Sequence, residues 1–158
     1  MKSLIITLLT LGLIACGYHL RSTNNLAVTY PKLQLNIKAQ SPLKRPLVNA
    51  LIASGITLSE NPQDDSLNIK KDTLRKVIQS IGANNNVQEY RLEYDVHYSI
   101  ANQEVRNIHL EKDYSFDIQQ ITGGQQEEIT LRKQLAEDMA WALIRQINAT
   151  IENSDSKK

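Results

Sequence analysis

Two histidines on neighbouring predicted strands are the residues of this sequence that could most readily bind a metal ion. His97 and His109 each lie in a stretch where polar and apolar residues alternate. If Tyr98 lies opposite Ile108 in a hairpin, the two imidazoles face each other on the polar side of the sheet. Imidazoles beside carboxylates can bind a divalent metal, but the pattern offers no third ligand. A solvated polar face is the default interpretation, and we predict no metal site.

A second candidate for chemistry is the one dense basic cluster of the sequence, formed by Lys70, Lys71, Arg75 and Lys76. Cations grouped in this way can bind a phosphate-bearing ligand. The alternative is that they neutralise the acidic side chains of the neighbouring strand. The sequence has no glycine-rich phosphate loop and no serine in a nucleophile-elbow motif. We therefore expect neither an enzyme nor a bound cofactor.

Length and composition point to one ordinary domain. The chain has 158 residues, with 18 Lys and Arg against 17 Asp and Glu, and 41% of its residues are hydrophobic. A net charge of +1 argues against nucleic-acid binding, which needs a basic face. The single cysteine excludes an intramolecular disulfide framework and a multi-cysteine metal site.

The position of that cysteine indicates export. Leu4 to Ile14 carries no charge and follows Lys2, and a helix of that length rises only about 16 Å, too short to cross a bilayer. Such a segment fits the apolar region of an export signal. The sequence Leu13-Ile14-Ala15-Cys16 resembles the bacterial lipobox, which implies removal of residues 1–15 and acylation of Cys16 with chains such as palmitate. The alternative is that Cys16 is a buried core thiol.

Beyond the leader, the patterns predict an α+β fold. We expect a polar tether at residues 16–29, one domain at residues 30–153 and a flexible tail at residues 154–158. Within the domain, strands are predicted near residues 32–37, 67–81, 90–100 and 108–118, with helices at 41–54 and 127–153. The order β-α-β-β-β-α predicts a four-stranded mixed sheet with two helices packed on one face.

Details within these elements refine the prediction. The apolar residues of the second strand change parity between Ile69 and Leu74, which indicates a bulge. Turn residues follow at Gly82 to Asn86, and Thr122-Gly123-Gly124 is predicted to break the sheet. Trp141, on the last helix, is expected to pack against the sheet.

The segment that follows the lipobox carries a resemblance to a known family. Cys16-Gly17-Tyr18-His19-Leu20-Arg21, the Gln88-Glu89-Tyr90 opening of the third strand and the order of elements are similar to the lipopolysaccharide-assembly lipoprotein LptE family, also called RlpB. The resemblance implies a protein without catalysis that plugs the outer-membrane β-barrel LptD. It would assist barrel maturation and the insertion of lipopolysaccharide or lipooligosaccharide into the outer leaflet. Cys16 would anchor it in the inner leaflet of the outer membrane, facing the periplasm, because Gly17 replaces the aspartate common in lipoproteins of the inner membrane.

The chain also departs from that family. Members can carry basic residues in the two turns that flank the third and fourth strands, whereas the turns here contain Gly82, Asn84, Asn85, Gly123 and Gly124 and no cation. We therefore predict that these turns contact the barrel and that the basic cluster substitutes as the lipopolysaccharide site. The alternative function is a stand-alone periplasmic lipoprotein that binds an amphiphile, which would require an apolar pocket between helices and sheet.

Overall fold

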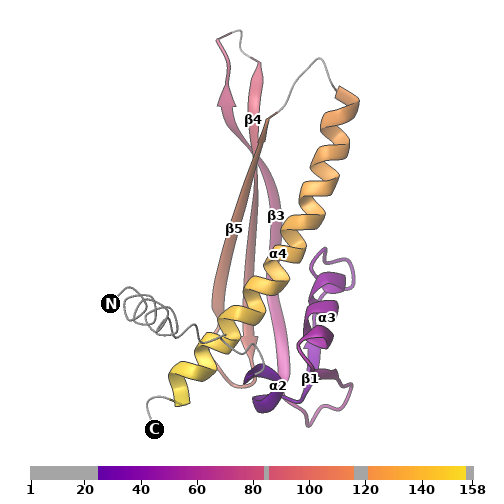
Figure 1. The fold of residues 1–158 in the computed structure, drawn as a ribbon, viewed down its shortest axis with the longest axis vertical. Helices are drawn as coiled ribbons and strands as arrows, with labels where there is room; N and C mark the ends of the chain where they lie inside the picture. The colour runs from indigo at the N-terminus through magenta and orange to yellow at the C-terminus, as the bar shows by residue number, and fades with distance from the viewer. Residues whose placement is uncertain (1–24, 84–85, 116–120, 156–158) are drawn as a thin grey trace, which may run out of the picture.

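The computed structural model describes residues 25–83, 86–115 and 121–155. The predicted leader, Cys16 and residues 156–158 of the predicted tail lie outside these residues. In chain order the elements are α2 (Asn25–Thr29), β1 (Lys32–Asn36), α3 (Lys44–Ala53), β2 (Thr57–Leu58), β3 (Ser66–Ile81), β4 (Val87–Ile100), β5 (Arg106–Ser115) and α4 (Ile121–Asp155) (Figure 1).

The strands form one mixed sheet in the order β2-β1-β3-β4-β5. β1 runs parallel to β2 and β3, and β3, β4 and β5 are antiparallel neighbours. The predicted α+β class and mixed sheet are confirmed, but the predicted count of four strands is wrong, because the sheet has five. The additional strand, β2, has two residues, which is too short for an alternating pattern to reveal it in the sequence.

The two longer helices pack on one face of this sheet, and α4 crosses the long strands diagonally (Figure 1). Along β4, Leu92, Tyr94, Val96 and Tyr98 are buried beneath the helices, whereas the residues between them remain accessible. This alternation is that of a strand with one covered and one open face. The other face of the sheet therefore remains available for charged side chains.

Helix α4 is longer than predicted, since it begins at Ile121 rather than at Glu127. Thr122-Gly123-Gly124, predicted to be a break after the sheet, instead lies in the first turn of this helix. A glycine within a helix costs about 1 kcal/mol relative to alanine. The apolar stripe of α4 offsets that cost, because it buries Leu135, Ala136, Met139, Ala140, Leu143, Ile144, Ile147 and Ile151.

The predicted tether is wrong in its last part. Asn25–Thr29 forms the short helix α2, and the Leu26 side chain is fully buried in the core. The helix closes with a hydrogen bond of 2.8 Å from the Tyr30 amide to the Leu26 carbonyl. A buried leucine gains roughly 1.5–3 kcal/mol from the hydrophobic effect, which explains why this segment folds onto the domain.

Helix α3 begins and ends near the predicted positions. Pro46 lies in its first turn, where the missing amide proton costs little. The helix stops before Gly55, whose φ of 84° favours glycine, and a Cβ added there would lie 3.4 Å from the Ala27 Cβ. Gly55, which follows the end of α3, therefore lies close to Ala27 of α2.

The predicted change of parity in β3 is confirmed as an irregularity in its pairing with β4. The register shifts between Ile69 and Lys71, so that Lys70 is the extra residue of a bulge. Two further shifts occur between Ile78 and Ile81, near the turn. The β4–β5 pairing, in contrast, runs without a shift from Glu89 opposite Ser115 to Tyr98 opposite Arg106.

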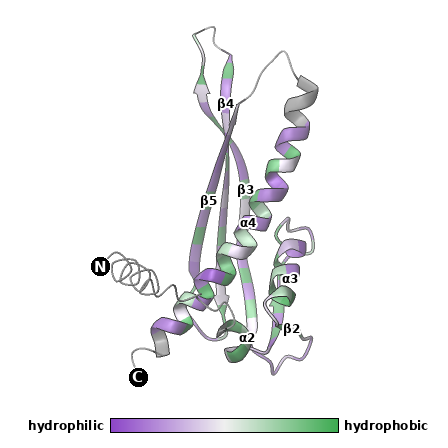
Figure 2. Ribbon diagram, in the orientation of Figure 1, coloured by the Kyte–Doolittle hydropathy of each residue, from purple (hydrophilic) through white to green (hydrophobic). Residues whose placement is uncertain are grey.

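The core lies between the covered face of the sheet and the helices. Figure 2 shows hydrophobic residues concentrated on α2 and α3, and hydrophilic residues along much of β5. None of the described helices combines the length and the apolar character that crossing a membrane requires. Two surfaces of the fold gather charged side chains: the open face of the sheet and a groove between α3 and α4.

Candidate functional site

The open face of the sheet carries a network of ion pairs, which we call the charged sheet face. Its members lie on β3, β4 and β5 and are Arg75, Arg91, Glu93, Asp95, His109, Glu111 and Asp113. Glu93 lies directly opposite Glu111 in the register, a pairing of like charges that would destabilise an isolated sheet. The arginines on either side of this acidic pair remove that repulsion.

Arg75 and Arg91 bind the acidic side chains in different ways. The Arg75 guanidinium lies 2.8 Å from Glu93 and 3.5 Å from Asp95. Arg91 donates two hydrogen bonds to the Asp113 carboxylate, at 2.6 and 2.8 Å. These bonds lower the pKa of Asp113 below its ordinary value. Of the predicted basic cluster, Arg75 thus neutralises acidic side chains of the neighbouring strand β4.

The predicted opposition of the two histidines is wrong. Tyr98 lies opposite Arg106, and the register therefore places Asn107 opposite His97 and Asp95 opposite His109. The His109 Nδ1 lies 2.8 Å from the Asp95 carboxylate, and this hydrogen bond raises the pKa of His109 above 6.5. Among residues 25–83, 86–115 and 121–155, no group of three or more potential metal ligands comes together.

The four residues of the predicted basic cluster do not converge on one point. Lys70 is the bulge residue, and Lys71 pairs in register with His97 on the open side of the sheet. Arg75 belongs to the charged sheet face, whereas Lys76 pairs with Leu92 and lies on the covered side. The strand period of two separates Arg75 from Lys76, and the bulge interrupts the order at Lys70.

Lys76 instead joins β3 to α4. Its Nζ lies 2.7 Å from the Glu128 carboxylate and 3.8 Å from the centre of the Tyr90 ring. The Tyr114 hydroxyl donates a hydrogen bond of 2.8 Å to the same carboxylate, and Arg132 donates another at 2.8 Å. Desolvation raises the pKa of Glu128, but these three donors outweigh it and lower the pKa to about 2.

The turns predicted to contact a partner lie at one end of the molecule. Gly82 begins the β3–β4 turn, where its amide donates a hydrogen bond of 2.8 Å to the Asn86 carbonyl. Gly123 and Gly124 lie in the first turn of α4, and Figure 1 places this turn and the hairpin at the same end of the fold. Asn84 and Asn85 lie outside the described residues. The sequence thus identified two segments that the fold brings to a common end.

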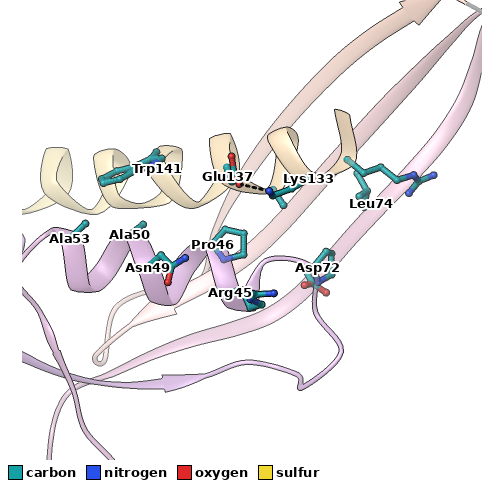
Figure 3. Close-up of a pocket in the computed structure, with 13 residues that line it drawn as sticks. Arg45, Pro46, Asn49, Ala50, Ala53, Asp72, Leu74, Lys133, Glu137 and Trp141 are labelled. Carbon is teal, nitrogen blue, oxygen red and sulfur yellow. Dashed lines mark ion pairs between the residues drawn. The ribbon is translucent and has the colours of Figure 1, made fainter. Parts of the chain in front are cut away.

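A groove of about 950 Å³ separates α3 from α4 beside β3 (Figure 3). Apolar and charged residues both line it: Pro42, Arg45, Pro46, Asn49, Ala50, Ala53, Asp72, Leu74, Arg132, Lys133, Ala136, Glu137 and Trp141. Trp141, expected to pack against the sheet, is 43% exposed and lines this groove instead.

Sequence reasoning missed the groove because two helices form it together. On α4, Lys133, Glu137 and Trp141 recur every four residues, which places them on one side of the helix. That stripe is separate from the apolar stripe through Met139 and Leu143, and an aromatic residue within a charged stripe was the available signal.

Solved structures of several bacterial lipoproteins resemble this fold. A minor lipoprotein from Acinetobacter baumannii is 26% identical, with a TM-score of 0.67 over 77% of this chain and 92% of that one. Rare lipoprotein B from Shewanella oneidensis is 21% identical, with a TM-score of 0.68 over 78% of this chain and 98% of that one. Lipoprotein B from Nitrosomonas europaea is 17% identical, with a TM-score of 0.69 over 78% and 85% of the two chains.

A comparison with curated protein sequences gives no match. The family model described as LptE, Lipopolysaccharide-assembly, matches residues 24–147, which include all of the sheet and most of α4. This match covers more than half of the chain and shows its family. The chain belongs to the LptE family and has a role in lipopolysaccharide assembly.

Proposed function

We propose that this protein assembles with the LptD β-barrel as a plug, assists maturation of the barrel, and aids insertion of lipopolysaccharide into the outer leaflet. The observation that carries the proposal is the match of the LptE family model over residues 24–147. A plug acts through surfaces and needs no catalytic group, so we expect no enzymatic activity.

The charged sheet face supports this role. A protein inside a wet barrel lumen must present a polar surface, because an apolar belt would favour lipid or aggregation. The face holds both signs of charge close together, as in the Arg91–Asp113 pair, and can meet polar lumen residues without a large net field. Its exposed ion pairs contribute little to folding, typically 0–1 kcal/mol each, and are therefore free to exchange partners.

The proposed anchor is the lipid on Cys16. Two or three acyl chains would hold the protein on the periplasmic side of the outer membrane, since one chain alone binds only marginally. The hairpin end with Gly82 and the first turn of α4 would then contact the barrel. Lys70 and Lys71 are exposed at the bulge and form no ion pair among the described residues, so they remain our candidates for binding the phosphates of lipopolysaccharide.

The test is a pull-down from outer membranes in mild detergent, with a tag placed after Lys158. We expect one large β-barrel in equal amount, identified by mass spectrometry as the LptD homologue. Recovery of the lipoprotein without a barrel would contradict the plug. The variant Gly123→Asp adds a carboxylate in the first turn of α4, where a helix accepts negative charge. Reduced barrel recovery with an unchanged melting curve would assign a contact to that turn.

The groove between α3 and α4 favours a second candidate, a stand-alone carrier of an amphiphile. The groove volume of about 950 Å³ lies within the range of ligand pockets. A carrier would be recovered without a barrel and with bound lipid, which lipid extraction and mass spectrometry of the purified protein would detect. The same pull-down therefore separates the two functions.

A further inference from the structure

The groove between α3 and α4 has a charged end and an apolar end. The two helices run in the same direction, so that Arg45 and Lys133 lie at one end and Ala53 and Trp141 at the other (Figure 3). From Arg45 to Ala53 the helix rises about 12 Å. A ligand that fills the groove therefore contacts the cations Arg45 and Lys133 at one end and the exposed Trp141 indole about 12 Å away at the other.

At the charged end of the groove, the Arg45 guanidinium is available to bind an acidic group. Arg45 has no hydrogen-bond or ion-pair partner among the described residues, and the Lys133–Glu137 pair is long, at 4.0 Å, and exposed. The Asp72 carboxylate, which also lines the groove, already accepts the hydrogen bond of the Ser41 hydroxyl. An acidic group entering here would complete the bonding of Arg45.

The apolar end of the groove exposes a large aromatic side chain of a type that is usually buried. Trp141 is 43% exposed, and it faces Ala50 and Ala53 across the groove. Large exposed apolar side chains bordered by charges mark surfaces that bind a partner.

The polar residues in the middle of the groove favour a peptide over a lipid chain. Asn49 and Glu137 lie between the two ends, and an alkyl chain would bury their polar groups without hydrogen bonds. A peptide backbone can donate hydrogen bonds to both side chains and accept one from the Asn49 amide. An extended peptide of about four residues covers 12 Å at 3.3 Å per residue.

We propose that this groove binds an extended peptide segment of the barrel partner. The segment carries a carboxylate that meets Arg45 and, about four residues away, an apolar or aromatic side chain that covers Trp141. This inference rests on the proposed function, since the barrel supplies the peptide. It adds a docking site on the helical side of the fold, away from the charged sheet face.

The test compares two charge reversals in neighbouring residues of α3. Arg45→Glu places a carboxylate in the groove, whereas Lys44→Glu makes the same change at an exposed residue that does not line it. With the tagged full-length protein in outer membranes, we expect Arg45→Glu to lower barrel recovery about tenfold, which corresponds to about 1.4 kcal/mol. Lys44→Glu should recover as much barrel as the original protein, and both variants should melt at the same temperature.

Cross-linking then identifies the segment. A photo-reactive residue at Asn49 should cross-link to a barrel peptide that contains an acidic residue, and the reverse charge change in that peptide should restore recovery with Arg45→Glu. If the original protein recovers no barrel, the proposed function fails. Two other results are that the original protein and Arg45→Glu recover the barrel equally well, or that Asn49 cross-links only to lipid. Either result would overturn the proposal that the groove binds a peptide and would leave the proposed plug function intact.

Discussion

One carboxylate, that of Glu128, joins three elements of the fold. It accepts hydrogen bonds from Lys76 of β3, Tyr114 of β5 and Arg132 of its own helix. The Lys76 ammonium also lies over the Tyr90 ring, which stacks on Tyr114 with ring centres 5.8 Å apart. The start of α4 is therefore attached to the sheet by charge and aromatic contact as well as by apolar packing.

We expect Glu128→Gln to lower the free energy of unfolding by about 1–2 kcal/mol at neutral pH, because the amide loses the charge that Lys76 needs. The pKa of Glu128 is lowered from 4.5 to about 2 on folding. The stabilisation is therefore complete above pH 4.5 and is lost as the pH falls towards 2.

Urea unfolding of both proteins between pH 7 and pH 2 measures this effect. The control is Glu137→Gln, whose pair with Lys133 is exposed and should contribute less than about 0.5 kcal/mol. Equal losses in the two variants, or an unchanged acid dependence in Glu128→Gln, would contradict the role of Glu128.

A second prediction at this scale concerns His109. Its pKa is raised by the Asp95 hydrogen bond, so that this small stabilising contribution is complete below pH 6.5 and is lost as the pH rises through the folded value. In an NMR titration, Asp95→Asn should move the pKa of His109 back towards 6.5, whereas Asp64→Asn, in a distant loop, should not. A His109 titration that is the same in all three proteins would show that Asp95 has no influence.

The residue types of the charged sheet face were predictable, but their partners were not. Composition and alternation placed arginines and carboxylates on one open face. The choice of Tyr98 opposite Ile108 rather than Arg106 moved every cross-strand pair by two positions. Side-chain alternation cannot detect a slip of two, because it leaves each residue on the same face.

At the scale of elements, the beginning of α3 depends on a contact with β3. The Ser41 hydroxyl donates to the Asp72 carboxylate and accepts a hydrogen bond of 3.1 Å from the Leu43 amide. Leu43, at the N-cap position, supplies no side-chain cap of its own. Ser41 therefore substitutes for the missing cap and attaches the helix to the sheet.

We expect Ser41→Ala to cost about 1 kcal/mol of stability, since it removes two hydrogen bonds from a partly buried site. Denaturant unfolding measures this, and faster hydrogen exchange confined to the α3 amides would locate it. Ser59→Ala is the matched control, because the Ser59 hydroxyl accepts only an exposed hydrogen bond from the Asn61 amide. A loss no larger than that of the control would remove Ser41 from this role.

The elements with a strong pattern were predictable, and those that depend on context were not. The alternation of β4 and the parity change of β3 followed from local sequence. The short strand β2 and helix α2 have too few residues for a pattern. The glycines at the start of α4 argue locally for a loop, and the packing of the rest of the helix overrides them.

At the scale of the molecule, the Cys16→Ala variant tests the anchor. Without a thiol there is no acceptor for the lipid, and we expect an unprocessed precursor of higher mass that is lost from the outer-membrane fraction. Intact-mass measurement and membrane fractionation check both results. A Ser22→Ala variant, which leaves the lipobox unchanged, is the control, and normal processing of Cys16→Ala would contradict the lipid anchor.

The general plan of the molecule was predictable because one-sided burial and the order of elements restrict the possible folds. The groove between α3 and α4 was not, because it depends on how far the two helices stand apart. Ala50 and Ala136 both line the groove, and their small side chains carry no pattern that would reveal it in the sequence.

The limited reach of β1 has a consequence for how the protein opens. β1 pairs with β3 only at Ser66, Leu67 and Asn68, so beyond this point β4 is the one described strand paired with β3. Amide protons near Leu67 and Ile100 should exchange only on global unfolding, whereas those near Ile78 should exchange through a smaller opening of lower free energy. The sheet near Leu67 and Ile100 thus exchanges slowly, whereas the β3–β4 hairpin near Ile78 can change its conformation independently. A partner could therefore alter the hairpin without unfolding the rest of the sheet.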